Sequence, residues 1–315
     1  MKRLLFAGLF LLLLCGCQPK MQTQTAYYFD TVVSISLPAD ADPALFDECW
    51  KQCSEYELRF DRFSEDSDIR RLLPYVPTVV DAETATVIDT ALTLSKATDG
   101  AFDIRLGALS DLWNTDSIPD SAGLTSALNE ALATKVITED NRVTVNGLGE
   151  LDLGGIAKGY AADALADYLR KEGVASAILN LGGNVFCLGD KSGKPFSVGI
   201  DTLMNQPDPP ILAITDQAAV TAGTTQRYRE IDGVRYHHIL DPKTGCPAET
   251  DLVSATVIAD SAAKADALAT ACIVWGSKKA EERLKDFPDV KAVLVQEQGG
   301  IITVRNPVFV SSAQK

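Results

Sequence analysis

The chain has 315 residues, of which 46% are hydrophobic and 23% are charged, with 22 glycines and 14 prolines. This composition excludes a collagen-like fibre, a coiled coil, a disordered chain and a multi-span membrane protein, and the length suits one large domain or two closely packed ones. The net charge of −14 makes nucleic acid and anionic membrane surfaces poor partners. A site for an anionic substrate would need its own positive charge, for which a bound metal ion is the expected source.

The first segment has the layout of an export signal. Lys2 and Arg3 precede an apolar run over residues 4–14 that is too short to span a bilayer. The run ends Leu-Cys-Gly-Cys, which resembles the lipobox of bacterial lipoproteins with Cys17 as the lipidated residue; a plain cleaved signal with incidental cysteines is the alternative. We expect a signal peptide (1–16), a lipidated N-terminus and polar tether (17–25), and one domain (26–315) exported and anchored on the periplasmic side of a bacterial membrane.

The other five cysteines do not predict a disulfide framework or a metal site. They are Cys49, Cys53, Cys187, Cys246 and Cys272, an odd number with irregular spacing. Cys49 and Cys53 are four residues apart on a predicted helix, where a disulfide would be strained, so we expect them to pack as thiols. No pair has the spacing of zinc ligands.

Strands and helices are expected in mixed order. A β-branched and aromatic stretch over 27–37 predicts a strand, and apolar residues at helical spacing predict a helix over 42–60. Further helices are expected over 81–98, 125–133, 157–172, 261–275 and 278–286; further strands over 135–138, 142–145 and 177–181, at several places within 185–258, and in a final hairpin of 292–296 and 301–305. Because βαβ units do not alternate regularly, the expected fold class is α+β.

One segment, Leu151–Tyr160, combines an acidic residue, two glycines and a lysine at the start of a predicted helix. Gly154 and Gly155 would let a ligand approach the backbone, and the free amides at the helix start favour phosphate. Lys158 would add a point charge. The spacing matches neither a P-loop nor the dinucleotide-binding fingerprint. A tight strand-to-helix turn with a surface lysine is the open alternative.

The two histidines of the chain are adjacent, at positions 237 and 238. Neighbours on a strand point to opposite faces, so at most one of them can face a given site. Histidine is suited to proton transfer near neutral pH, and the Asp-Pro-x-Thr-Gly turn that follows would fix the end of the strand. A purely structural role for both histidines stays open.

The predicted helix over 261–275 places Asp266 and Thr270 one turn apart on the same face, and five alanines between Ala262 and Ala269 make it thin. A carboxylate, a hydroxyl and a nearby backbone carbonyl are ligands suited to Mg²⁺. The alternative is an Asp that complements the helix dipole and a Thr that bonds back to its own helix. Gly182-Gly183-Asn184 and residues 221–224 are either flexible rims of a pocket or turns.

Six segments, in their order along the chain, resemble the ApbE family, the FAD:protein FMN transferases. They are Asp66-Ser67-Asp68-Ile69, Gly100-Ala101-Phe102-Asp103-Ile104, Asp152 to Gly159, Gly182-Gly183-Asn184, His238 to Gly245, and Asp266 to Thr270. The match runs from about Phe29 to Gly276. It implies a single mixed α/β domain with FAD in a central cleft. It also implies a reaction that cleaves the FAD pyrophosphate, transfers FMN to a Thr or Ser hydroxyl of a target protein, and releases AMP.

The resemblance also implies roles for individual residues. It implies FAD contacts from Phe29, Phe63, Ala101, Phe102, Asp103, Asp152, Lys158 and His238. It implies Mg²⁺ held by Asp266, Thr270 and the carbonyl of Gly155, which agrees with a phosphoryl transfer that depends on charge neutralisation and alignment. His238 would be a candidate general base. The implied acceptors are exported subunits of membrane redox complexes, such as the sodium-pumping quinone reductase or Rnf-type complexes.

Three positions depart from the family pattern. Phe29-Asp30-Thr31 stands where many members have Met-Gly-Thr, Arg105 replaces the usual Thr, and Ala222 replaces a common Ser. Arg105 would either bring another positive charge to the cleft or point into solvent.

Two other functions stay open at this point. One is a Mg²⁺-dependent FAD pyrophosphatase with water as the acceptor. An aromatic Phe63 at the cleft rim would shield the pyrophosphate from water, which favours the transferase. The other is a flavin-binding or solute-binding lipoprotein without chemistry, in which Asp266 and Thr270 would be ordinary helix residues.

Overall fold

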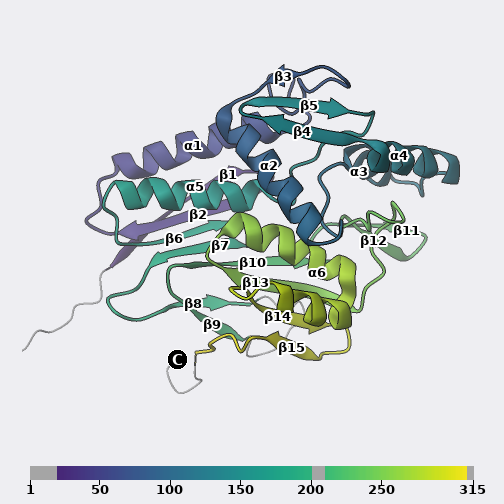
Figure 1. The fold of residues 1–315 in the computed structure, drawn as a ribbon. Helices are drawn as coiled ribbons and strands as arrows, with labels where there is room; N and C mark the ends of the chain where they lie inside the picture. The colour runs from purple at the N-terminus through teal and green to yellow at the C-terminus, as the bar shows by residue number, and fades with distance from the viewer. Residues whose placement is uncertain (1–19, 201–209, 311–315) are drawn as a thin grey trace, which may run out of the picture.

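A computed structural model describes residues 20–200 and 210–310, and an eight-stranded sheet forms its centre (Figure 1). The strand order is β1-β2-β6-β7-β10-β13-β14-β15, and every neighbouring pair is antiparallel. The strands are β1 (Met21–Tyr28), β2 (Thr31–Pro38), β6 (Ser176–Leu181), β7 (Asn184–Gly189), β10 (Gln217–Gly223), β13 (Leu252–Ala259), β14 (Lys291–Gln296) and β15 (Ile301–Val304).

Helices cover one face of this sheet, with α1, α5 and α6 closest to it (Figure 1). The helices are α1 (Ala44–Phe60), α2 (Ala82–Ala97), α3 (Gly107–Trp113), α4 (Ser121–Ala133), α5 (Ala157–Lys171) and α6 (Ala262–Arg283), followed by a 3₁₀ turn (Leu284–Asp286). No helix in the described ranges is both long and apolar enough to cross a bilayer. The layered arrangement confirms the expected α+β class, although α3 was not expected.

Three small sheets complete the fold. They are β3 (Thr78–Val79), β5 (Arg142–Asn146) and β4 (Lys135–Glu139) in that order, the pair β8 (Phe196–Gly199) and β9 (Ile211–Ile214), and the pair β11 (Tyr228–Ile231) and β12 (Val234–His237). The β8–β9 pair belongs to a separate apolar cluster that includes Phe196 and Leu212 with Ile258 and Val293 of the large sheet. The β11–β12 hairpin lies on the side of α3 and α4 (Figure 1).

The N-terminal boundary differs from the expectation. Residues 21–25, expected within the tether of 17–25, form part of β1, and the single strand expected over 27–37 is a hairpin that turns at Phe29-Asp30. The polar side chains of 21–25 predicted a tether, but they are compatible with a strand because β1 is an edge strand. Its backbone pairs with β2, while much of its surface stays in solvent. The signal peptide of 1–16 and the lipidation site at Cys17 lie outside the described residues.

The cysteines that the structure describes are all free, as expected. Cys49 and Cys53 lie on the buried face of α1, and burial raises the pKa of each thiol to about 12. Such thiols stay protonated and pack as small apolar groups.

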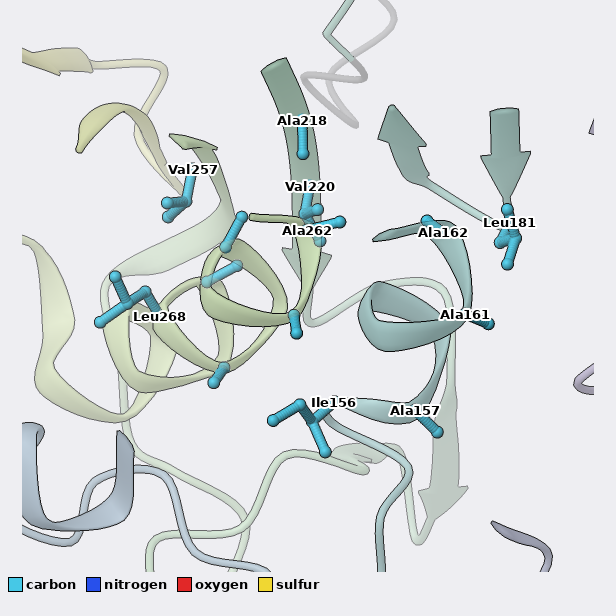
Figure 2. Packing of buried hydrophobic residues seen from close by; sticks show 14 of the residues in the cluster. Ile156, Ala157, Ala161, Ala162, Leu181, Ala218, Val220, Val257, Ala262 and Leu268 are labelled. Atoms are coloured by element: carbon cyan, nitrogen blue, oxygen red, sulfur yellow. The ribbon is translucent and has the colours of Figure 1, made fainter. Parts of the chain in front are cut away.

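Helices α5 and α6 pack closely, and each binds the N-terminus of the other through a carboxylate. Asp163 of α5 accepts hydrogen bonds from the amides of Ala262 and Ala263 at 2.6 and 3.0 Å. Asp266 of α6 accepts one from the amide of Gly159, in the first turn of α5, at 3.1 Å. Figure 2 shows the small side chains of Ala161, Ala162 and Ala262 in this region. Amides at helix starts lack partners within their own helix, so these carboxylates fix both helices.

We predict that Gly159→Ala destabilises the protein by about 1–3 kcal/mol, the usual effect of overpacking a tight core. A Cβ at this position would lie 2.4 Å from the carbonyl oxygen of Ala262 and 2.7 Å from the Cα of Ala263, both of which are backbone atoms that cannot rotate away. Chemical denaturation of both proteins measures the difference.

Gly199→Ala is the control for that substitution, because a Cβ there has no atom of the described residues within 4 Å. Its free energy of unfolding is expected to stay within about 0.5 kcal/mol of the wild type. Equal stability of Gly159→Ala and the wild type would show that the two helices are not in tight contact.

Candidate active site

A cleft of about 910 Å³ lies among the helices, the β1–β2 turn and the β11–β12 hairpin. Its walls come from parts of the chain far apart in sequence: the β1–β2 turn, the end of α1 with the loop after it, α3, the start of α5, and residues 227–240. The lining residues are Phe29, Asp30, Glu57, Phe60, Asp61, Arg62, Phe63, Ser110, Asp111, Trp113, Asn114, Asp152, Gly154, Ala157, Lys158, Arg227, Tyr228, Arg229, Tyr236, His237, His238 and Leu240.

Five of the eight expected FAD contacts line this cleft. They are Phe29, Phe63, Asp152, Lys158 and His238. Ala101, Phe102 and Asp103 do not line it: Ala101 and Phe102 are buried, and the ring of Phe102 lies against Gly155. The structure therefore brings five of the expected contacts together in one cleft, whereas Ala101, Phe102 and Asp103 lie outside its lining.

The start of α5 has the features expected of an anion site. Its N-cap residue, Ile156, offers no side-chain hydrogen bond, and Ala157 and Lys158 line the cleft. Asp152 accepts a hydrogen bond from the amide of Gly154 at 2.8 Å, and the ammonium of Lys158 donates to the Gly154 carbonyl at 3.2 Å. These bonds hold a lysine at the positive end of the α5 dipole, an arrangement that favours phosphate, although the amides of Ile156 and Ala157 already bond the carbonyl of Leu153.

The expected metal ligands lie beside this helix start. Asp266 is 6% exposed, and its Oδ2 accepts hydrogen bonds from the Gly159 amide and from Asn184 at 2.9 Å. Burial raises the pKa of its carboxyl, and Lys158 and the two hydrogen bonds oppose that rise. Thr270 is close to Gly155, since a Cβ built on that glycine would lie 3.7 Å from the Thr270 hydroxyl.

This donor set fits a hard divalent cation. Asp266 forms no ion pair within 4 Å in the part of the chain that the structure describes, so a cation would offset the desolvation of its carboxylate. The same ranges contain no group of three or more His, Cys, Asp or Glu able to hold a metal. One carboxylate, one hydroxyl and one carbonyl would leave several positions to water and phosphate oxygens, as Mg²⁺ prefers.

The two histidines differ in what their ring nitrogens bind. In His237, Nε2 donates to the carbonyl of Ala248 at 3.0 Å and Nδ1 accepts from the amide of Ile239 at 3.3 Å, so both nitrogens are occupied. In His238, Nδ1 bonds the carbonyl of Arg227 at 3.0 Å. A carbonyl only accepts, so Nδ1 carries the proton and Nε2 keeps a lone pair. His237 is therefore structural, and His238 is the one able to take a proton.

The surroundings of His238 keep its ring neutral. Desolvation by the cleft walls lowers its pKa to about 4, with smaller contributions from the charges of Arg227, His237 and Lys158, although the hydrogen bond to the Arg227 carbonyl acts the other way. Solvent reaches the ring at the cleft surface. At neutral pH His238 is thus an acceptor in a single tautomer.

Arg105 follows neither of the two expectations. Its guanidinium pairs with Asp103 at 2.5 Å and donates to the carbonyl of Thr134 at 2.7 Å, so it faces neither the cleft nor open solvent. This pair also occupies the carboxylate of Asp103, the third of the expected FAD contacts that lie behind the cleft wall.

Several cleft residues were not expected from the sequence. Arg62 is almost fully buried: its guanidinium lies 4.5 Å from the Phe63 ring and bonds Asp111 and the carbonyl of Gly107. The rings of Trp113 and Tyr236 stack on another part of the wall at 5.3 Å. Sequence offers no signal for these residues, because only the fold distinguishes a cleft arginine or aromatic ring from a surface or core one.

The Gly182-Gly183-Asn184 motif, expected as a pocket rim or a turn, contacts both Thr31 and Asp266. Gly182 has a φ of +64°, and a Cβ there would lie 2.4 Å from Thr31, which stands next to the Phe29-Asp30 turn. Asn184 donates the hydrogen bond that holds Asp266. The motif therefore connects the cleft mouth to the expected metal ligands.

Comparison with known proteins identifies the family. The sequence profile described as the ApbE family matches residues 29–294. The chain belongs to the ApbE family. A FAD:protein FMN transferase of Treponema pallidum is 34% identical over 284 residues, which cover 82% of this chain and 78% of the relative. One from Klebsiella pneumoniae is 35% identical over 275 residues, 83% of this chain and 85% of the relative.

Solved structures of the family share the fold. The crystal structure of the ApbE protein of Thermotoga maritima has a TM-score of 0.82 and 31% identity, covering 91% of this chain and 97% of that one. The flavin transferase ApbE of Vibrio cholerae has a TM-score of 0.80 and 26% identity, covering 94% and 99%. These matches confirm both the resemblance drawn from the six motifs and the single mixed α/β domain.

We predict that His238 titrates well below 6.5, near pH 4, in the folded protein. The unfolded chain binds the proton more tightly, so the contribution of His238 to stability is lost as the pH falls from about 6.5 to 4. NMR titration of the two imidazole rings measures the pKa, and His238→Gln assigns the signal. A His238 pKa at or above 6.5 would contradict the desolvated wall described above.

Proposed function

We propose that this chain transfers FMN from FAD to a Thr or Ser hydroxyl of a protein, with Mg²⁺, and releases AMP. Membership of the ApbE family makes it an enzyme of the flavin-transferase type. The observation that carries the finer proposal is the conjunction of Asp152, Lys158 and His238 in one cleft with the Asp266–Thr270–Gly155 donor set beside it.

The chain's own residues account for binding and alignment. Lys158 and the positive end of the α5 dipole would hold the FAD pyrophosphate. Mg²⁺ on Asp266, Thr270 and the Gly155 carbonyl would neutralise the charge that develops on the phosphates. Nε2 of His238 would accept the proton of the attacking hydroxyl. The FMN phosphorus then gains a bond to the acceptor oxygen and loses its bond to AMP.

Phe63 favours a protein acceptor over water. Phe63 is 67% exposed at the cleft, and its ring lies against the guanidinium of Arg62. Hydrogen bonds to Asp111 and to the Gly107 carbonyl hold that guanidinium. A rigid aromatic ring at this place would limit the access of water to the pyrophosphate. A Mg²⁺-dependent pyrophosphatase that makes FMN and AMP is the second candidate function, since it would use nearly the same residues.

The proposed location rests on the N-terminal sequence, and the proposed partners rest on the family resemblance. Residues 1–17 support export, cleavage and lipidation at Cys17, which would place the enzyme on the periplasmic side of a bacterial membrane. Its acceptors would be exported subunits of membrane redox complexes, of the sodium-pumping quinone reductase or Rnf type. Relatives named FAD:protein FMN transferase support a protein acceptor in general.

AMP release tests the reaction. Purified protein is mixed with FAD and Mg²⁺, with and without an exported acceptor domain of the quinone reductase. AMP only with the acceptor indicates a transferase, AMP in both indicates a pyrophosphatase, and AMP in neither leaves a flavin binder. Asp266→Asn and His238→Ala are each expected to slow AMP release by at least about 100-fold, because one removes a charge that holds the metal and the other removes the base.

Asp289→Asn is the control for the carboxylate. Asp289 is a surface residue that pairs with Lys264 outside the cleft, and its loss is expected to change the rate less than about 2-fold. His238→Ala is expected to keep FAD binding, which calorimetry measures. Absence of FAD binding by the wild type, with or without Mg²⁺, would reject the proposed function.

The lipid anchor is tested in cells. Wild type is expected to incorporate labelled palmitate and sediment with membranes, whereas Cys17→Ser is expected to do neither, because the thiol is the site of acylation. Cys246→Ser is the control, since Cys246 lies in a loop of the folded domain. Absence of labelling in the wild type would indicate a plain cleaved signal, and equal labelling of Cys17→Ser and the wild type would place the acyl group on another residue.

A further inference from the structure

The β1–β2 hairpin turns through two residues in the left-handed region, although neither is glycine. Phe29 has a φ of 55° and Asp30 a φ of 56°, and both line the cleft. Two-residue turns of this type favour Asn-Gly or Asp-Gly, because only glycine takes such a φ without steric strain. For a bulky residue such as Phe29 the conformation is an outlier, so surrounding contacts must hold it.

The contact that holds the turn comes from α1. The carboxylate of Glu57 accepts a hydrogen bond from the backbone amide of Phe29 at 2.6 Å, and the bond is partly buried. Glu57 lies on the last turns of α1 and itself lines the cleft. A bond from a charged acceptor to a backbone amide is among the stronger ones, and it fixes the residue that carries the strain.

A second contact links the turn to the opposite wall of the cleft. The guanidinium of Arg227 donates to the carbonyl of Asp30 at 3.4 Å, a long bond. The Arg227 carbonyl accepts from both the amide and Nδ1 of His238, at 3.1 and 3.0 Å. The turn is therefore connected through Arg227 to the histidine at the proposed reaction centre.

We propose that Glu57 is a positioning residue that clamps the strained Phe29-Asp30 turn and so holds Phe29 and Asp30 in place at the mouth of the cleft. The clamp holds Phe29 in a conformation that a bulky residue rarely adopts without such a contact. This inference rests on the proposed function for its consequence, FAD binding, but the clamp itself is a property of the folded chain.

The experiment compares Glu57→Ala, Glu57→Gln and the double variant Glu57→Ala/Asp30→Gly with the wild type. Glu57→Ala is expected to speed hydrogen exchange of the Phe29 amide and to raise KM for FAD, each by about 10-fold, while kcat changes less than about 2-fold. Glu57→Gln keeps an acceptor oxygen and is expected to stay within about 3-fold of the wild type in both measurements. In the double variant, a glycine at position 30 removes the strain at that residue but not at Phe29, so KM is expected to return only part of the way.

Glu48→Ala is the matched control, because Glu48 is on the same helix but bonds only Lys51 and Gln52. It is expected to leave the exchange of the Phe29 amide and the kinetics unchanged. A purely structural role for Glu57 would lower the melting temperature without changing KM. The clamp is overturned if Glu57→Ala keeps either the slow exchange or the FAD KM of the wild type.

The two proposals fail in different ways. A wild type that does not bind FAD rejects the proposed function, whatever the exchange data show. A wild type that binds FAD no more tightly than Glu57→Ala does rejects the clamp alone.

Discussion

The cleft depends on the close contact between α5 and α6. Gly159 allows this approach, since any side chain there would meet the backbone of Ala262 and Ala263. The contact is fixed by two carboxylates. Asp163 of α5 accepts hydrogen bonds from the start of α6, and Asp266 of α6 accepts one from the start of α5. The positive partial charge at each helix start stabilises the negative carboxylate that bonds it, despite the burial of that carboxylate. If the two helices separated, both Lys158 on α5 and the proposed metal ligands on α6 would be displaced.

Asp266 has two roles that explain its burial. As a partner of the Gly159 amide and of Asn184 it is part of the fold, and as a buried carboxylate with a raised pKa it is a site that a cation would stabilise. Both hydrogen bonds end on Oδ2, so a metal bound through Oδ1 would not have to break them. A metal bound by Asp266 would therefore couple the stability of the domain to metal binding.

The charges of the cleft explain how an acidic chain handles an anionic dinucleotide. Asp30, Glu57, Asp61, Asp111 and Asp152 line the cleft together with Arg62, Lys158, Arg227 and Arg229. Arg62 pairs with Asp111 and Arg229 with Asp116, whereas Lys158 and Arg227 form no ion pair within 4 Å in the described residues. A metal on the proposed donor set beside Lys158 would add further positive charge.

The sequence by itself determined the fold class, most helices and the chemical motifs, because amphipathic periods and short motifs such as 152–159 are local. It also placed Asp266 and Thr270 one turn apart on a helix, whereas their role as metal ligands was implied only by the family resemblance and stays a prediction. Only the tertiary structure decided that Asp103 pairs with Arg105 behind the wall, that Asn184 holds Asp266, and that Glu57 bonds Phe29. The Asn184–Asp266 and Glu57–Phe29 contacts join separate segments, so they depend on how the sheet and helices pack. Asp103 and Arg105 are two residues apart, but only the packing of the fold sets their place relative to the cleft.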